Sequence, residues 1–345
     1  MSAEAVTLYQ LADAEIRRCI DSYLALAKAT SGLSIISAAD VAEPRTRAIL
    51  LAGLGVSPDI AGTASDLETV EEWKRRQAIP FSLEDGITFG VYRDIRGASI
   101  TFLDSVETAT DGFTKFDADY IHANPYTLPI FQHVAGVFSK SALKKEIGSA
   151  SDVSISKPAA AKLAKLLSDR VKPGAINKGE ILQRVESTLE GIVRDLIGRV
   201  LFESIVDSAL KDVGVKFLRE NEYTALEGVV YNFRADFVLP DAVKPKVFIE
   251  VRKSSSRHAS LYAKDKMFSA INWKGKTQDL LGVLIVDGEW TGETLKVMAN
   301  VFDYVVPIGR VAELAETVKA YVDGDTSKLK WLIEFKIVAA NHQKK

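Results

Sequence analysis

The sequence predicts an α/β protein in which helices flank a mixed central β-sheet, preceded by a mainly helical N-terminal region. Three observations lead to this prediction. Apolar residues early in the chain recur at the three- and four-residue spacing of helices. Between about 214 and 308, several short runs either alternate polar and apolar residues or are continuously apolar, as strands do. Amphipathic segments separate some of those runs, which indicates helices between strands.

In the N-terminal region, we expect helices over 4–29, 40–56 and 65–78. The first contains no Gly or Pro. The third opens with Ser65 and has Glu68 three positions later, which is the pattern of a capping box.

Residues 86–104 are predicted to form short strands, and a loop-rich stretch that includes 122–129 follows. The composition then changes: a small polar stretch leads into a basic helix, which a Lys-Pro-Gly sequence ends. We therefore expect four parts, with approximate boundaries: an N-terminal region at 1–150 with a recognition or dimerisation role, a basic helix and linker at 151–178, an α/β core at 179–330 and a C-terminal tail at 331–345.

In the α/β core, amphipathic and strand-like segments follow one another in the order αβββαβαβα. This order favours an antiparallel meander that a crossover continues into a mixed sheet. The expected elements are a helix at 179–211, strands at 214–224, 231–240 and 246–256, a helix at 257–273, a strand at 280–286, a helix at 292–302, a strand at 303–308 and a helix at 311–322.

The second and third of these strands carry the most informative residues of the chain. Alternation places Asp236 on one face of its strand, and Glu250 and Arg252 together on one face of the next. The short connection contains Asp and Pro, so a tight antiparallel turn is expected. Two carboxylates this close repel each other unless a divalent metal or a proton lies between them. Hard oxygen ligands of this kind suit Mg²⁺.

Bulk composition is that of an ordinary globular protein, with 47% hydrophobic and 26% charged residues. The single cysteine, Cys19, excludes an intramolecular disulfide and fits a reducing compartment. No stretch approaches the about 20 apolar residues that span a membrane, and the N-terminus lacks the basic start of a signal peptide. We expect a cytoplasmic protein with no membrane partner.

The charge is unevenly distributed, although the net charge is only −2. Residues 1–120 hold 11 Lys/Arg against 19 Asp/Glu, whereas 121–180 and 241–280 each hold 9 against 4. Positive charge is thus concentrated in two segments, one of them around the Asp236–Glu250 pair, where local potential would attract a polyanion.

The element order, with Asp on the second strand and Glu-x-cation on the third, resembles the PD-(D/E)xK nuclease superfamily and, within it, the type II restriction endonucleases. The resemblance covers roughly 180–310. It implies a restriction-endonuclease-like αβββαβ core, with Asp236 and Glu250 as catalytic residues that hold Mg²⁺ together with a main-chain carbonyl near residue 251.

The resemblance also implies an acid from the helix before the first strand. We expect Glu186 in that role, with Glu190 as an alternate, because both lie near the start of the 179–211 helix. Glu203 is not favoured because it lies too close to the end of that helix.

Two positions depart from the family pattern. Ala235 stands where the family often has Pro, at a position that varies widely. The usual Lys is Arg252, which cannot act as a base but can stabilise charge on a phosphate. Lys253 is an equal candidate if a β-bulge turns it into the site, and Lys264 or Lys266 on the following helix are further alternatives.

The start of that helix supplies the expected DNA contacts. Its serines either cap the helix or contact phosphate through hydroxyls and helix N-terminal amides. The expected DNA-binding residues are Ser254, Ser255, Ser256, Arg257, His258 and Lys264.

A simpler interpretation makes Asp236, Glu250 and Arg252 a cross-strand ion pair on a wet sheet face. It does not explain why the following helix begins with Arg257 and carries Lys264. We therefore expect a type II restriction endonuclease: a homodimer that hydrolyses double-stranded DNA at a specific sequence with Mg²⁺. The alternatives are a nuclease of DNA repair, recombination or phage defence with structural specificity, and a non-catalytic DNA-binding protein with a nuclease-like fold.

Overall fold

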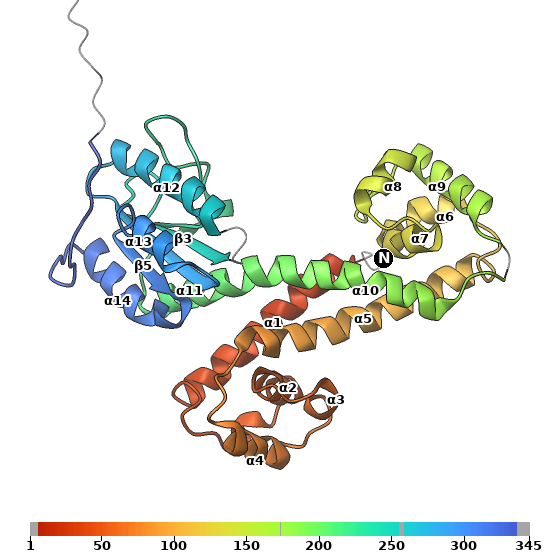
Figure 1. Cartoon of the computed structure of the whole chain (residues 1–345), viewed down its shortest axis with the longest axis horizontal. Coiled ribbons are helices and arrows are strands. Elements are labelled where there is room, and N and C mark those ends of the chain that lie inside the picture. The colour runs from red at the N-terminus through yellow and green to blue at the C-terminus, as the bar shows by residue number, and fades with distance from the viewer. Residues whose placement is uncertain (1–5, 173, 255–258, 337–345) are drawn as a thin grey trace, which may run out of the picture. The chain divides into compact units, whose positions relative to one another are not determined.

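The computed structural model describes residues 6–172, 174–254 and 259–336, without the side chains of 259–262. The chain divides into two compact units between Val200 and Leu201, and each unit is described by itself (Figure 1). The segment 151–178, in which the sequence analysis placed a linker, lies within the first unit as a helix and the loop after it.

The first unit is helical throughout the part that the structure describes. Ser65 and Glu68 form the predicted capping box at the start of the fourth helix. The α-helices are α1 (Leu8–Ala29), α2 (Pro44–Gly53), α3 (Pro58–Ala61), α4 (Asp66–Arg76), α5 (Leu83–Ala109), α6 (Ala118–Ala123), α7 (Leu128–Val134), α8 (Lys140–Ile147), α9 (Lys157–Arg170) and α10 (Lys178–Leu196).

The strands predicted at 86–104 are wrong, because this stretch lies inside the 27-residue helix α5. Gly86 marks close helix packing rather than a turn, because a Cβ there would lie 2.6 Å from the carbonyl oxygen of Ile49 in α2. Ile87, Val91 and Ile95 are buried at four-residue spacing, which is the helical period. The stretch expected to be loop-rich also contains helices, namely α6, α7 and α8.

The expected helix at 179–211 is divided into two. A π-helical turn at Ile197–Leu201 separates α10 from α11 (Phe202–Asp212), and the boundary between the two units falls within this turn. The helix predicted as one element therefore contributes to both units.

The second unit is built on a five-stranded mixed sheet in the order β1-β2-β3-β4-β5. The first three strands pair antiparallel and the last three parallel, which confirms the predicted mixed sheet and order of elements. Its strands are β1 (Leu218–Arg219), β2 (Phe237–Leu239), β3 (Val247–Ser254), β4 (Leu281–Gly288) and β5 (Tyr304–Pro307), and its other helices are α12 (Ala259–Lys276), α13 (Gly292–Met298) and α14 (Val311–Val322).

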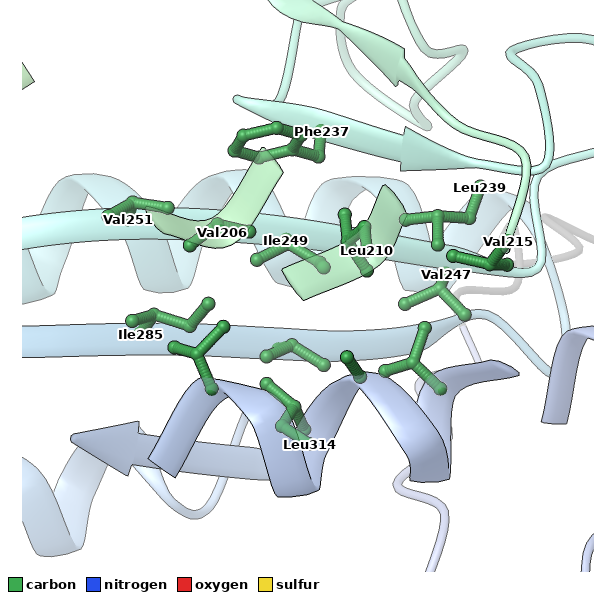
Figure 2. Close-up of a cluster of buried hydrophobic side chains, with 14 of the residues drawn as sticks. Val206, Leu210, Val215, Phe237, Leu239, Val247, Ile249, Val251, Ile285 and Leu314 are labelled. Atoms are coloured by element: carbon green, nitrogen blue, oxygen red, sulfur yellow. The ribbon is translucent and has the colours of Figure 1, made fainter. Parts of the chain in front are cut away.

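Alternation along β3 sends side chains to two cores, one on each face of the sheet. Val247, Ile249 and Val251 pack with α11 and α14 on one face (Figure 2). Phe248 packs on the opposite face against Trp273 of α12, with ring centroids 5.0 Å apart. Residues of even number in β3 therefore face α12, which decides where Glu250 points.

Candidate active site

Asp236 and Glu250 lie side by side on the face of the sheet that α12 covers. Asp236 directly precedes β2, and the antiparallel register that pairs Phe237 with Ile249 continues to place Asp236 opposite Glu250. Asp236 Oδ2 accepts a hydrogen bond from the backbone N–H of Val251 at 2.7 Å, which fixes this carboxylate against β3. The predicted placement of the two acids on one face is thus found in the structure.

Arg252 bridges the two acids. Its Nη1 donates to Asp236 Oδ2 at 2.8 Å, and its Nη2 lies 2.9 Å from Glu250 Oε2. The same Nη1 also donates to the backbone carbonyl of Val251. One guanidinium therefore contacts the two carboxylates and the carbonyl of Val251, the residue that follows Glu250.

Lys266 of α12 adds a second cation, with Nζ 3.1 Å from Glu250 Oε2. The cluster thus contains two carboxylates and two cations. Glu250 is 0% exposed and Asp236 is nearly buried, whereas Arg252 and Lys266 keep part of their side chains in solvent. The cations therefore screen the acids from water at the surface of the unit.

Burial and, to a lesser extent, the neighbouring charge of Asp236 raise the pKa of Glu250 to about 8, although Arg252 and Lys266 oppose the shift. For Arg252, burial lowers the pKa, but the charges of Glu250 and Asp236 outweigh it and leave the pKa raised. Glu250 would thus lose its proton more readily if a further cation approached, because extra positive charge favours the carboxylate.

Glu250 Oε1 is buried and has no hydrogen-bond partner among the described residues. A buried acceptor without a partner is costly, so it marks a position where a ligand would be stabilising. The donor set, two carboxylates and a carbonyl, is of the hard-oxygen type that binds Mg²⁺. In the described ranges, no group of three or more His, Cys, Asp or Glu forms a ready-made metal site, so the Val251 carbonyl or the substrate would have to complete it.

Lys253 does not share this site. Its side chain points to the opposite face of the sheet, where Nζ lies 5.7 Å from the ring centroid of Phe202. The β-bulge on which its alternative role depended is absent from β3, because β3 and β4 pair one to one from Val247 to Ser254. Of the proposed cations, the structure brings Arg252 and Lys266 to the acids.

Glu186 belongs to the other unit, where its carboxylate accepts a hydrogen bond from Arg96 Nε at 2.8 Å. The acid that shares a unit with Asp236 and Glu250 is instead Glu203, in the first turn of α11. Glu203 forms an ion pair with Arg219 at 2.9 Å, and its charge contributes to the raised pKa of Arg252. The sequence predicts one long helix at 179–211, and Glu203 lies near the end of that helix. In the structure, Glu203 lies instead near the start of a second helix.

The expected DNA contacts are described only in part. Ser254 is buried at the end of β3, where its carbonyl accepts from the backbone N–H of Glu289 at 2.9 Å. Lys264 is exposed on α12. The other four, Ser255, Ser256, Arg257 and His258, lie outside the described residues.

Neither a family model, nor a curated protein, nor a solved structure matches this chain. Among the described helices, none has the length and apolar character required to cross a membrane.

Proposed function

We propose that this protein is a Mg²⁺-dependent DNA endonuclease of the PD-(D/E)xK type. The observation that carries the proposal is the position of the Arg252 guanidinium. It contacts the Asp236 carboxylate, the Glu250 carboxylate and the Val251 carbonyl. These are the three oxygen groups that the family resemblance implies around the metal. A cation already stabilises this arrangement of oxygens, which supports its use as a cation site.

In this proposal, Asp236, Glu250 and the Val251 carbonyl would hold Mg²⁺. When bound, the metal would lower the pKa of a water molecule and neutralise charge on the attacked phosphate. The Val251 N–H keeps Asp236 oriented, and the buried Glu250 Oε1 supplies an acceptor that has no partner among the described residues. Arg252 and Lys266, which now contact the acids, would bind the phosphate of a DNA strand instead.

The direct test is digestion of unmethylated phage DNA by the purified protein, with Mg²⁺ and with EDTA in parallel. We expect cleavage only with Mg²⁺. Discrete fragments would support a type II restriction enzyme that acts as a homodimer, because a palindromic site is cut on both strands by two identical centres. Smears, or cutting confined to branched substrates, would support a nuclease of repair, recombination or phage defence. Intact DNA on every substrate would contradict the proposal.

A second candidate is a non-catalytic DNA-binding protein, which one observation favours. Arg252 and Lys266 already contact Asp236 and Glu250, so both acids have cation partners without a metal. The two candidates differ in whether a divalent metal replaces Arg252 at the carboxylates.

Replacement of Arg252 by Met is expected to tighten Mn²⁺ binding about tenfold or more. It removes a positive charge that contacts the proposed ligands and would repel a metal there. Mn²⁺ binding is measured by electron paramagnetic resonance or calorimetry. Arg252→Gln, which also removes the charge but keeps a polar end that can contact the Asp236 carboxylate, provides a second variant if the Met variant is unstable.

Lys253→Met is the matched control, because it removes the same charge from the adjacent position on the opposite face of β3. Its Mn²⁺ affinity is expected to change little. If neither Arg252 variant binds Mn²⁺ more tightly than wild type, the oxygens that Arg252 contacts are not the metal ligands.

A further inference from the structure

Aromatic side chains are exposed on the loop between β1 and β2 and on the adjoining helix α12. Phe233 of the loop is 46% exposed and Phe268 of α12 is 49% exposed. The ring of Tyr231 stacks on Phe268 with centroids 5.3 Å apart and meets Phe233 edge-on. We call Tyr231, Phe233 and Phe268 the aromatic ridge; the exposed Val229 and Val230 lie beside it in sequence.

The loop that carries the ridge is fixed to α12 by Asn272. The Asn272 side chain accepts from the backbone N–H of Val230 at 2.7 Å and donates to the carbonyl of Tyr231 at 2.9 Å, and its backbone carbonyl accepts from Val229 at 3.1 Å. Asn272 is itself buried. A Cβ on Gly228 would lie 1.9 Å from Asn272 Nδ2, so this approach requires glycine. The rings are therefore exposed on a fixed support, and binding to them would require little ordering of the loop.

The ridge lies close in sequence to the charged cluster along both segments that build it. Phe233 lies three residues before Asp236, and Phe268 lies two residues after Lys266 on α12. Tyr223 holds the intervening backbone, since its hydroxyl contacts both the N–H and the carbonyl of Ala235, at 2.6 and 2.8 Å.

The charges around the ridge also favour a polyanion. Lys264 is exposed one helical turn before Phe268, and Arg234 directly follows Phe233. The nearby acids are paired with cations: Glu220 lies 3.7 Å from Arg234, and the acid at the start of the loop, Glu227, lies 3.6 Å from a lysine of α12. The exposed Asp265, three residues before Phe268, lies 3.8 Å from Lys266 Nζ. Aromatic rings that are interspersed with cations are typical of surfaces that bind single-stranded nucleic acid.

We propose that the aromatic ridge stacks against unpaired nucleobases, so that the substrate contains single-stranded or locally unpaired DNA at the ridge. The inference rests on the proposed nuclease function for the adjoining phosphate site. Stacking needs an accessible aromatic face and tolerates any base, because every base has a π-face. An intact duplex does not offer such faces, since its bases are stacked on one another. A fixed pair of half-exposed rings thus favours DNA whose bases are already unstacked.

The test is equilibrium binding of an oligonucleotide that contains 2-aminopurine, a base whose fluorescence reports stacking. The oligonucleotide is used single-stranded and fully paired, in EDTA, so that no cleavage is needed. Phe233→Leu and Phe268→Leu keep an apolar side chain but remove the ring. We expect each variant to bind the single strand about fivefold or more weakly and to lose the change in 2-aminopurine emission. Phe138→Leu is the matched control, because Phe138 is 70% exposed in the other unit.

Two results would overturn the inference. One is single-strand binding and 2-aminopurine emission that are the same in wild type and in both ridge variants. The other is a loss of self-association in those variants, measured by sedimentation, with no change in DNA binding, which would make the ridge a contact between copies of the chain.

The assay also separates this inference from the proposed function. Cleavage in Mg²⁺ together with unchanged single-strand binding by the ridge variants would remove the stacking site and leave the nuclease. Ring-dependent binding without cleavage of any substrate would support the stacking site and remove the nuclease.

Discussion

Replacement of Asp236 by Asn is expected to reduce DNA cleavage about a thousandfold while the fold and DNA binding are retained. Asn preserves the side-chain oxygen that accepts from the Val251 N–H at 2.7 Å, so β2 and β3 stay in register. The amide is neutral, however, and is a poorer ligand for Mg²⁺ than a carboxylate. A thousandfold loss corresponds to about 4 kcal/mol of transition-state stabilisation, which is within the range of a metal's contribution.

The measurement is the rate of cleavage at saturating protein, together with DNA affinity in EDTA. Asp265→Asn serves as the control, because it removes the same charge from an exposed carboxylate on α12 that lies 3.8 Å from Lys266 Nζ. Its cleavage rate is expected to stay within a few-fold of wild type. Cleavage by the Asp236 variant at the rate of the Asp265 variant would show that Asp236 takes no part in the chemistry.

The α/β core was largely predictable because its segments are long or strongly periodic. The last helix, Val311–Val322, was predicted with its observed bounds. The alternation predicted along β3 is also observed, because its successive side chains pack into cores on opposite faces of the sheet. Shorter strands were predicted too long: of 231–240, only Phe237–Leu239 pairs as a strand, because the residues before it form the loop fixed by Asn272. Such a contact, between residues 42 positions apart, leaves no local signal.

The errors in the N-terminal region have a different cause. Gly86 and Gly90 lie in helix α5, where they allow close approach to Ile49 and to the sulfur of Cys19. In a sequence, glycine among β-branched residues predicts strands and turns. Only the helix that packs against these glycines reveals that the segment is helical. Tertiary contact has overridden local propensity here.

For the candidate site, alternation was sufficient to place Asp236 and Glu250 together, since side chains in strands alternate strictly. The choice among cations required the register of β3 with β4, which excludes a bulge and directs Lys253 to Phe202. Glu186 was preferred to Glu203 because the sequence predicts one continuous helix. The π-helical turn at Ile197–Leu201 divides this helix, and it has no local sequence signal comparable to a helix-breaking Pro.

The largest expected effect on stability comes from a second buried charge cluster in the same unit. Asp303, whose side chain is 0% exposed, accepts from Lys274 Nζ and from the backbone N–H groups of Gly282 (2.6 Å) and Ile333. It thereby connects α12, β4 and the segment after α14. Burial lowers the pKa of Lys274, while the charge of Asp303 opposes this shift. The pair is therefore costly to separate, because each charge lacks water.

Lys274→Met is expected to lower the free energy of unfolding by about 3–5 kcal/mol, because it leaves Asp303 charged, buried and without a cation. The measurement is urea denaturation at neutral pH. Lys276→Met removes the same charge two residues later, from a side chain that is 50% exposed, and should change stability by about 0.5 kcal/mol or less. Equal stability of the two variants would mean that the buried pair is not needed to hold α12. If α12 does loosen in the Lys274 variant, Lys266 and Phe268 lose their fixed positions, so single-strand binding should weaken before the unit unfolds.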